Sequence, residues 1–182
     1  MELKAAIGLG NPGPLYRKTR HNFGGRVVEF ICDEFNLRLK PGKGYYYYAE
    51  KEGLLFVRPT TWINESGIAV SELILHFPLS FENILIILDD MDLPFGKLRM
   101  RNSGSAGGNK GLASVIYHLD SEDIPRLRIG IGKPEKEDAI DWVLSPFTEK
   151  EEEEINEIME SAKKAIFLWA DENIEAAMST IN

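Results

Sequence analysis

Apolar runs long enough to cross a membrane are missing from this sequence, and cysteine occurs only once. The apolar run at residues 84–88 is far shorter than the roughly 20 residues that a membrane-spanning helix needs. Residues 1–4 lack the pattern of a signal peptide. The single cysteine, Cys32, cannot form an internal disulfide, and its place in an apolar helical pattern favours packing in a core. We therefore expect a cytoplasmic protein that does not bind a membrane.

Several common catalytic motifs are missing as well. The three histidines, at positions 21, 76 and 118, show no metal-ligand spacing. The serine elbow G-x-S-x-G fails because Ser103, not glycine, stands two residues before Ser105. A G-x-G-x-x-G spacing occurs at residues 8–13, but residues 14–20 separate it from the helix that a dinucleotide fingerprint must open. Zinc hydrolysis, covalent serine hydrolysis and dinucleotide binding are therefore disfavoured.

Positive charge is scarce overall, because the formal net charge is −8. Proteins that bind nucleic acid usually carry an excess of lysine and arginine, so this balance argues at first against such a partner. However, residues 149–160 hold seven acids and one lysine, a net −6, which leaves −2 for the rest of the chain. Residues 93–119 contain no acid and four cations, Lys97, Arg99, Arg101 and Lys110. This segment is either a local phosphate-binding patch or an ordinary basic surface.

Strand and helix patterns alternate along the chain. The spacing of apolar residues predicts strands at residues 5–10, 45–50, 54–58, 83–88, 97–101 and 126–132, and helices at residues 23–35, 68–77, 112–119 and 148–177. Residues 51–53 would close a hairpin, and its four tyrosines favour a sheet surface over a base-stacking platform. We expect an α/β fold in a single domain of residues 1–182, with a mixed β-sheet covered by helices on both faces.

Polar side chains follow the ends of two predicted strands. Asn11, His21 and Asn22 lie in the loop after the first strand, and aspartates at residues 89, 90 and 92 end the central strand. In open α/β sheets, ligands bind beyond the carboxyl ends of the strands, so we expect chemistry there. A histidine at this edge is a candidate base, although a single histidine is more often structural. The aspartates could instead hold magnesium against a phosphate.

Four blocks of sequence follow one another in the order typical of one known family. They are residues 8–13 with Tyr16 and residues 19–22, then residues 59–67, 89–96, and 107–111 leading to 126–134. In these blocks the chain resembles bacterial-type peptidyl-tRNA hydrolases. The resemblance implies the α/β fold of that family. It also implies metal-independent hydrolysis of the ester between a peptide and the 3′-terminal ribose of tRNA, which recycles peptidyl-tRNA dropped by stalled ribosomes.

The resemblance also implies a set of catalytic residues. His21 matches the catalytic base of the family, and Asp89 matches the carboxylate partner of that base. A neutral imidazole, with an ordinary pKa of about 6.5, can take a proton from water at cellular pH. Asn11 and Asn64 match amides that hold the peptide or donate to the oxyanion, and one such donor contributes roughly 3 kcal/mol. Turn chemistry explains Asn11 equally well before the family match is considered.

Further matches concern substrate binding. Tyr16 and Ile63 match substrate-binding positions, and Ile63 stands where the family usually has methionine. Arg101 and Arg128 match a clamp on the tRNA 5′-phosphate, to which two guanidinium groups can make forked contacts. We expect the partner to be the acceptor end and 5′-phosphate of peptidyl-tRNA, bound by a monomer without a cofactor.

Lys110 departs from the family pattern. The family usually has His-Asn after the paired glycines, whereas this chain has Asn109-Lys110. An ammonium there could stabilise an oxyanion or contact a phosphate, but it could also disfavour the protonated form of His21 or displace the bound water. The main alternative is therefore a catalytically impaired homologue that acts as an RNA-binding accessory factor, and a nucleotide-binding enzyme comes third.

Overall fold

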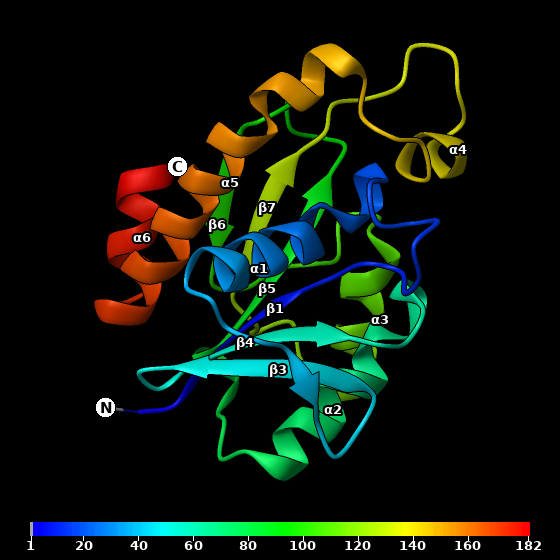
Figure 1. The fold of residues 1–182 in the computed structure, drawn as a ribbon. Coiled ribbons are helices and arrows are strands. Elements are labelled where there is room, and N and C mark those ends of the chain that lie inside the picture. The colour runs from blue at the N-terminus through cyan, green and yellow to red at the C-terminus, as the bar shows by residue number, and fades with distance from the viewer. Residues whose placement is uncertain (1) are drawn as a thin grey trace.

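A computed structural model describes residues 2–182, and a seven-stranded sheet forms the centre of this part of the chain (Figure 1). The strands are β1 (Lys4–Gly8), β2 (Lys40–Pro41), β3 (Tyr46–Lys51), β4 (Leu54–Pro59), β5 (Ile84–Asp90), β6 (Leu98–Arg101) and β7 (Arg126–Gly130). The α-helices are α1 (Phe23–Glu34), α2 (Ser66–His76), α3 (Lys110–Leu119), α4 (Ala139–Val143), α5 (Glu149–Asp171) and α6 (Ile174–Ile181). Single 3₁₀ turns are η1 (Arg20–Asn22), η2 (Ile63–Glu65) and η3 (Phe81–Asn83).

The sheet is mixed, with the strand order β2-β3-β4-β1-β5-β7-β6. β1 pairs in parallel with β4 and β5, and β5 pairs in parallel with β7. The edge strands add the antiparallel pairs β2–β3, β3–β4 and β6–β7. Because β1, β4, β5 and β7 run in the same direction, their carboxyl ends meet at one edge of the sheet. The segments that follow these four strands are therefore brought together in space.

Helices cover both faces of the sheet, as the strand pattern predicts. Ala6 of β1 faces α1, α5 and α6, whereas the next residue, Ile7, faces α2 and α3. Figure 1 shows α1 lying across the sheet with α5 and α6 beside it, while α2 and α3 lie on the other side. All seven residues of β5 are buried, as expected of a central strand with both faces covered. Burial of each large apolar side chain contributes about 1.5–3 kcal/mol to stability.

Two glycines allow α1 to approach the sheet closely. A Cβ atom on Gly8 would collide with the backbone of Gly24, and one on Gly24 would collide with the backbone of Ile87. Both positions therefore require a residue without a side chain. The close approach seats the first turn of α1, and η1 before it, directly at the carboxyl ends of β1 and β5. The sequence thus places His21 against the end of the central strand.

The predicted elements are confirmed with three differences. The prediction of one continuous helix over residues 148–177 is wrong, because α5 ends at Asp171 and α6 begins at Ile174. The reason is Asn173, whose side chain accepts from the N–H of Ala176 and caps a new helix. The sequence pattern also missed α4 and the short β2. Finally, Tyr46 does not lie on the sheet surface: it is almost fully buried, and its hydroxyl group is bonded to His76 Nδ1.

Cys32 lies in the core, as its sequence pattern predicts. Burial, together with the nearby Asp33 and Glu29 carboxylates, raises the pKa of its thiol to about 11. The thiolate, which is the reactive form, is therefore suppressed at neutral pH. Within residues 2–182, no helix combines the length and the apolar character that a bilayer crossing requires.

Candidate active site

A cleft of about 450 Å³ opens at the carboxyl edge of the parallel strands. Its volume is in the range of sites for small molecules and cofactors, so it can hold a nucleotide-sized group. One wall comes from η1, η2, the end of β5 and the start of α3, and the opposite wall is α4. The polar residues of the cleft include Asn11, His21, Asn64, Asp89, Lys110 and Arg128, and the apolar ones include Trp62, Ile63, Ile140 and Leu144.

The His21 ring is bonded to the Asp89 carboxylate at the base of the first wall. The two carboxylate oxygens lie 2.9 and 3.0 Å from His21 Nδ1. His21 is 8% exposed and Asp89 only 2% exposed. Because an ionised carboxylate can only accept a hydrogen bond, Nδ1 must carry the proton, and Nε2 keeps its lone pair. The ring is thus held in the tautomer in which Nε2 can take a proton from a group in the cleft.

The Asn11 side chain is fixed beside this pair. Its Oδ1 accepts from the N–H of Ile63 at 2.8 Å, so its Nδ2 is left as a donor toward the cleft. The backbone of Asn11 is held in turn by the Asn22 amide, which accepts from Asn11 N at 2.8 Å and donates to Asn11 O at 2.9 Å. Asn22 therefore fixes the turn after β1, and Asn11 joins this turn to η2.

Arginines gather on one face of the β6–β7 edge. Arg99 is opposite Arg128 and Arg101 is opposite Arg126 in the antiparallel ladder, so all four side chains leave the same face. Arg101 and Arg128 are diagonal neighbours, which places their Cα atoms about 7–8 Å apart. Arg126 is buried and donates to four backbone carbonyls, and burial, followed by the nearby Arg128 charge, lowers its pKa to about 10. This edge of the sheet is strongly cationic.

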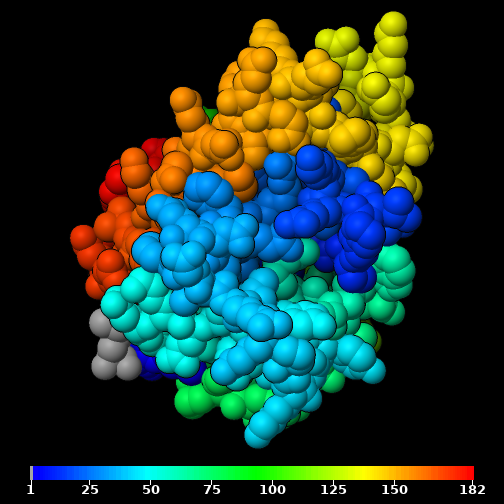
Figure 2. Space-filling model, viewed as in Figure 1, coloured from blue at the N-terminus to red at the C-terminus, as the bar shows by residue number. Residues whose placement is uncertain are grey.

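α4 is attached to the rest of the molecule through few polar contacts. The Trp142 indole N–H donates to Gly132 O, and the Arg20 guanidinium lies 3.7 Å from the centre of the Trp142 ring. Arg20 is 2% exposed, donates to both carboxylate oxygens of Glu151, and donates from Nε to Ser145 Oγ. Figure 2 shows the yellow segment that contains α4 at one corner of the surface, next to the dark blue loop after β1. Arg20, the residue before His21, thus joins the two walls.

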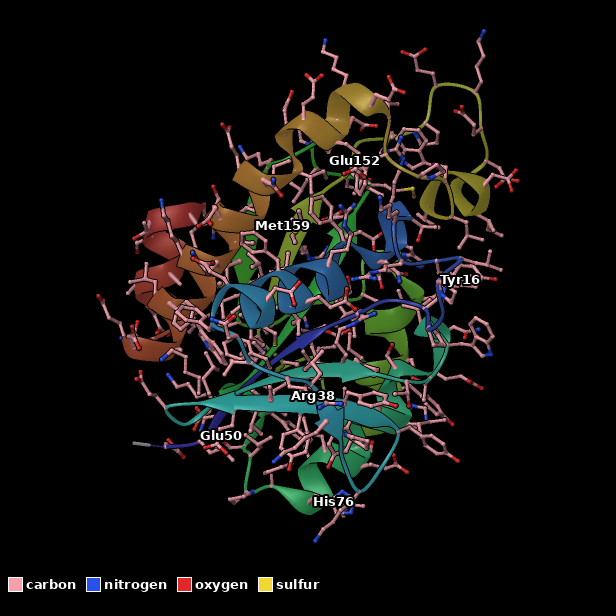
Figure 3. All side chains as sticks on the ribbon, in the orientation of Figure 1. Tyr16, Arg38, Glu50, His76, Glu152 and Met159 are labelled. Carbon is pink, nitrogen blue, oxygen red and sulfur yellow. The ribbon has the colours of Figure 1, made fainter. Side chains whose placement is uncertain are left out.

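The structure brings most of the predicted site residues together. Asn11, His21, Ile63, Asn64, Asp89, Lys110 and Arg128 all line the cleft. Tyr16 and Arg101 are not among its lining residues. Tyr16, which Figure 3 labels on the loop after β1, packs edge-to-face on Trp62 with the ring centres 5.6 Å apart. Tyr16 therefore supports the wall of the cleft rather than forming it.

The three carboxylates at the end of β5 have three different partners. Asp89 contacts His21, Asp90 lies 3.4 Å from Arg128, and Asp92 lies 3.0 Å from Lys133. Within residues 2–182, no three His, Cys, Asp or Glu side chains are grouped in a way that could hold a metal ion. The sequence pattern of the three aspartates therefore corresponds to three separate ion pairs or hydrogen bonds in the structure.

Some residues of the cleft were missed by the sequence reasoning. Trp62, Ile140 of α4 and Leu144 just after α4 carry no catalytic group, so only their position at the cleft reveals them. The sequence identified Asn109 as part of a departure from the family pattern but did not predict its contact with Asp89. Its Nδ2 lies 3.2 Å from Asp89 O and 3.3 Å from Asp89 Oδ1. No sequence spacing signals this contact, because it joins residues 20 positions apart.

Comparison with known proteins assigns this arrangement to a family. The family model described as peptidyl-tRNA hydrolase matches residues 5–182. Peptidyl-tRNA hydrolases from Methylacidiphilum infernorum and Latilactobacillus sakei are 48% and 40% identical to this chain, cover 97% and 99% of it, and are themselves covered over 96% and 98% of their length. The crystal structure of peptidyl-tRNA hydrolase from Acinetobacter baumannii matches with a TM-score of 0.90 at 32% identity, over 99% of this chain and 94% of that one. The chain therefore belongs to the peptidyl-tRNA hydrolase family.

Proposed function

We propose that this protein hydrolyses the ester bond between the peptide and the tRNA in peptidyl-tRNA, with His21 as the general base. The observation that carries the proposal is the His21–Asp89 pair, which is buried on one side and open to the cleft on the other. The family model and the full-length relatives that match this chain are named for this activity. The product tRNA would return to translation after premature release from the ribosome.

The proposed reaction begins with a water molecule in the cleft. His21 Nε2 takes a proton from the water as its oxygen attacks the ester carbonyl carbon. Asp89 keeps the ring oriented and stabilises the imidazolium that forms. When the tetrahedral intermediate collapses, the bond to the ribose 3′-oxygen breaks and the imidazolium returns the proton to that oxygen. The free peptide acid and the tRNA 3′-hydroxyl are the products, and the base is regenerated.

Neighbouring residues would position the substrate. The free Nδ2 of Asn11 is a suitable donor to the developing oxyanion, where one donor contributes roughly 3 kcal/mol. Asn64 lines the same wall and supports a contact with the peptide backbone. Ile63 and Trp62, with Tyr16 behind it, would form an apolar surface for the terminal nucleoside or the peptide side chains.

The cationic edge of the sheet would bind the end of the tRNA. The spacing of Arg101 and Arg128 on one face suits forked contacts to a single phosphate, and Arg128 also reaches the cleft. Lys110 is exposed in the first turn of α3 and lines the cleft, so its ammonium supports a further phosphate contact near the 3′ end. We propose that the 5′-phosphate and the acceptor end are recognised by these three cations.

The alternative of a catalytically impaired homologue, which Lys110 raises, finds no support here. The His21–Asp89 pair is intact, and Asn11 keeps a donor toward the cleft. The relatives that match over nearly the whole chain are peptidyl-tRNA hydrolases. Lys110 therefore leaves the proposed base and its carboxylate partner in place.

One assay tests the proposed function. The pure protein and its His21→Ala variant are incubated with N-acetyl-aminoacyl-tRNA and with free aminoacyl-tRNA, with and without chelator. We expect release of N-acetyl-amino acid by the unchanged protein only, no cleavage of the free aminoacyl-tRNA, and no effect of chelator. Binding of tRNA without turnover by the unchanged protein would contradict the proposal and support the accessory factor.

The same assay tests recognition of the tRNA end. Removing the 5′-phosphate from the substrate should raise KM about tenfold, the loss expected for one charge-assisted contact. The Arg128→Ala variant should show the higher KM for the substrate with the 5′-phosphate and for the substrate without it, because the side chain that would bind this phosphate is absent. Arg38→Ala is the matched control, since Arg38 is an exposed cation outside the cleft lining (Figure 3). If the unchanged protein had equal KM values for the substrates with and without the 5′-phosphate, the proposed 5′-phosphate contact would be refuted.

A further inference from the structure

The backbone carbonyl of Asp89 lies at the point where the sheet loses a strand. Ile87 O, two residues earlier on β5, accepts from Leu9 N just past the end of β1. Carbonyls two residues apart point to the same side of a strand, so Asp89 O also points toward the β1 side. At this level the segment after β1 has left the sheet and forms the loop that carries Asn11. A buried carbonyl needs a donor, and β1 supplies none at this position.

Asn109 supplies that donor and also reaches the Asp89 carboxylate. Its Nδ2 lies 3.2 Å from Asp89 O and 3.3 Å from Asp89 Oδ1, the oxygen that is 2.9 Å from His21 Nδ1. One amide group thus bridges the backbone and the side chain of the same aspartate. This contact extends the series of hydrogen bonds from His21 through Asp89 to the start of α3.

The helix cap decides which way the Asn109 amide faces. Asn109 is the N-cap of α3, and its Oδ1 accepts from the N–H of Leu112 at 3.0 Å. Because a backbone N–H can only donate, the oxygen of the amide must face the helix and the NH₂ group must face Asp89. A rigid helix therefore holds the donor at a fixed place, as a positioning residue requires.

We propose that Asn109 is a positioning residue that fixes the Asp89 carboxylate and, through it, the orientation and basicity of His21. The inference rests on the proposed function of His21 and extends it to a position where the family usually has histidine. In this chain the amide performs two tasks at once: it caps α3 through its oxygen and holds the catalytic carboxylate through its nitrogen.

Other charged groups around the pair are already engaged elsewhere or lie in solvent. Asp90 of β5 faces Arg128 of β7, and Arg20 of η1 faces Glu151 of α5. Lys110 of α3 is exposed. A charge introduced at position 109 would therefore act on the Asp89–His21 pair more directly than any of these groups.

Two substitutions separate the cap from the contact with Asp89. Asn109→Ser and Asn109→Asp both keep an oxygen that can accept from Leu112 N, so both retain the cap. Both lose the donor to Asp89, and aspartate also adds a negative charge beside it. Asn173→Ser and Asn173→Asp are matched controls, because Asn173 caps α6 in the same way, through Ala176 N at 2.8 Å, and does not line the cleft.

The first readout is kinetic. For Asn109→Ser we expect kcat to fall about tenfold with KM within twofold, as for the loss of one hydrogen bond to a charged group. For Asn109→Asp we expect the acid limb of the kcat/KM profile to move upward by about one pH unit, because a second carboxylate favours the imidazolium. Thermal midpoints should match those of the Asn173 controls, whose kinetics should equal those of the unchanged protein.

The second readout does not depend on turnover. NMR titration of the His21 ring in the free protein, assigned by the signal that His21→Ala removes, should show the same upward shift for Asn109→Asp and none for Asn173→Asp. If the protein proved inactive on peptidyl-tRNA, this shift would still support the inference while the proposed function failed. Superimposable ring titrations in Asn109→Asp, Asn109→Ser and the unchanged protein would overturn the inference, as would activity losses that merely follow the thermal midpoints.

Discussion

The two walls of the cleft are built in opposite ways. The inner wall is the one formed by η1, η2, the end of β5 and the start of α3, and the outer wall is α4. In the inner wall, Asn11, His21 and Asp89 are almost fully buried and are bonded to groups of fixed position. In the outer wall, α4 has no buried residue, and Ile140 is 57% exposed. The part of the inner wall around His21 is polar and held by several hydrogen bonds, whereas the outer wall presents the apolar Ile140 and is held mainly through Trp142 and the segment after it.

The difference fits two tasks that the proposed reaction requires. A general base must stay within a few tenths of an ångström of its productive geometry, so its neighbours have to be rigid. A surface that receives different peptides and a nucleoside needs apolar area but no single fixed geometry. We therefore expect changes in the inner wall to lower kcat and changes in the outer wall to raise KM.

Asp89→Asn should have the largest effect, because it changes the inner wall alone. The asparagine keeps the shape but can present an NH₂ group to the ring and so favour the wrong tautomer. We expect kcat to fall about 10²–10⁴-fold, the range of general-base contributions, with KM nearly unchanged. The double variant with His21→Ala should be no slower than His21→Ala alone. Additive losses in steady-state kinetics would show that the two residues do not act as one group.

Arg20→Met should have an intermediate effect, because Arg20 joins the two walls. The change keeps an apolar stem but removes the contacts with Glu151 and Ser145. We expect unfolding by urea to show a loss of about 2 kcal/mol, and kcat/KM to fall roughly tenfold through both kcat and KM. Arg26→Met is the control, since Arg26 also donates to both carboxylate oxygens of a glutamate at the start of α5, from Nη1 and Nη2 to Glu152, but does not stack on Trp142 of α4 as Arg20 does. If Arg26→Met lowered kcat/KM equally, Arg20 would act only through stability.

Ile140→Ser should have the smallest effect, because it changes the outer wall alone. Its side chain is already more than half exposed, so stability should stay within about 0.5 kcal/mol. We expect KM for N-acetyl-aminoacyl-tRNA to rise roughly two- to fivefold, as the loss of part of a buried apolar contact predicts, with kcat unchanged. Leu15→Ser is the control, because Leu15 is exposed and lies outside the cleft lining. A fall in kcat instead would place α4 in the catalytic step.

The sequence predicted the inner wall better than the outer one, for a physical reason. His21 lies in the segment after β1, and Asp89 lies at the end of β5. Because both strands end at the same edge, the polar residues there mark that edge directly. The α/β fold with helices on both faces followed from the alternation of apolar periods. These features depend on local patterns, which a sequence displays.

The features that the sequence did not predict depend on contacts between distant segments. The bond from Asn109 to Asp89 requires the start of α3 to lie beside the end of β5. α4 is only five residues long, too short for its periodicity to be distinguished from a loop. The break between α5 and α6 turns on the single cap at Asn173, and Tyr46 is buried because α2 covers its face of the sheet.

The central claim, that His21 is a base held by Asp89, is tested most directly by the pH profile of kcat/KM on N-acetyl-aminoacyl-tRNA. With chemistry rate-limiting, we expect kcat/KM to rise tenfold per pH unit below the midpoint and then level off, because only the neutral ring accepts a proton from water. The rise should be absent from the residual activity of His21→Ala. A profile that stays flat from pH 5 to 8 would contradict this account.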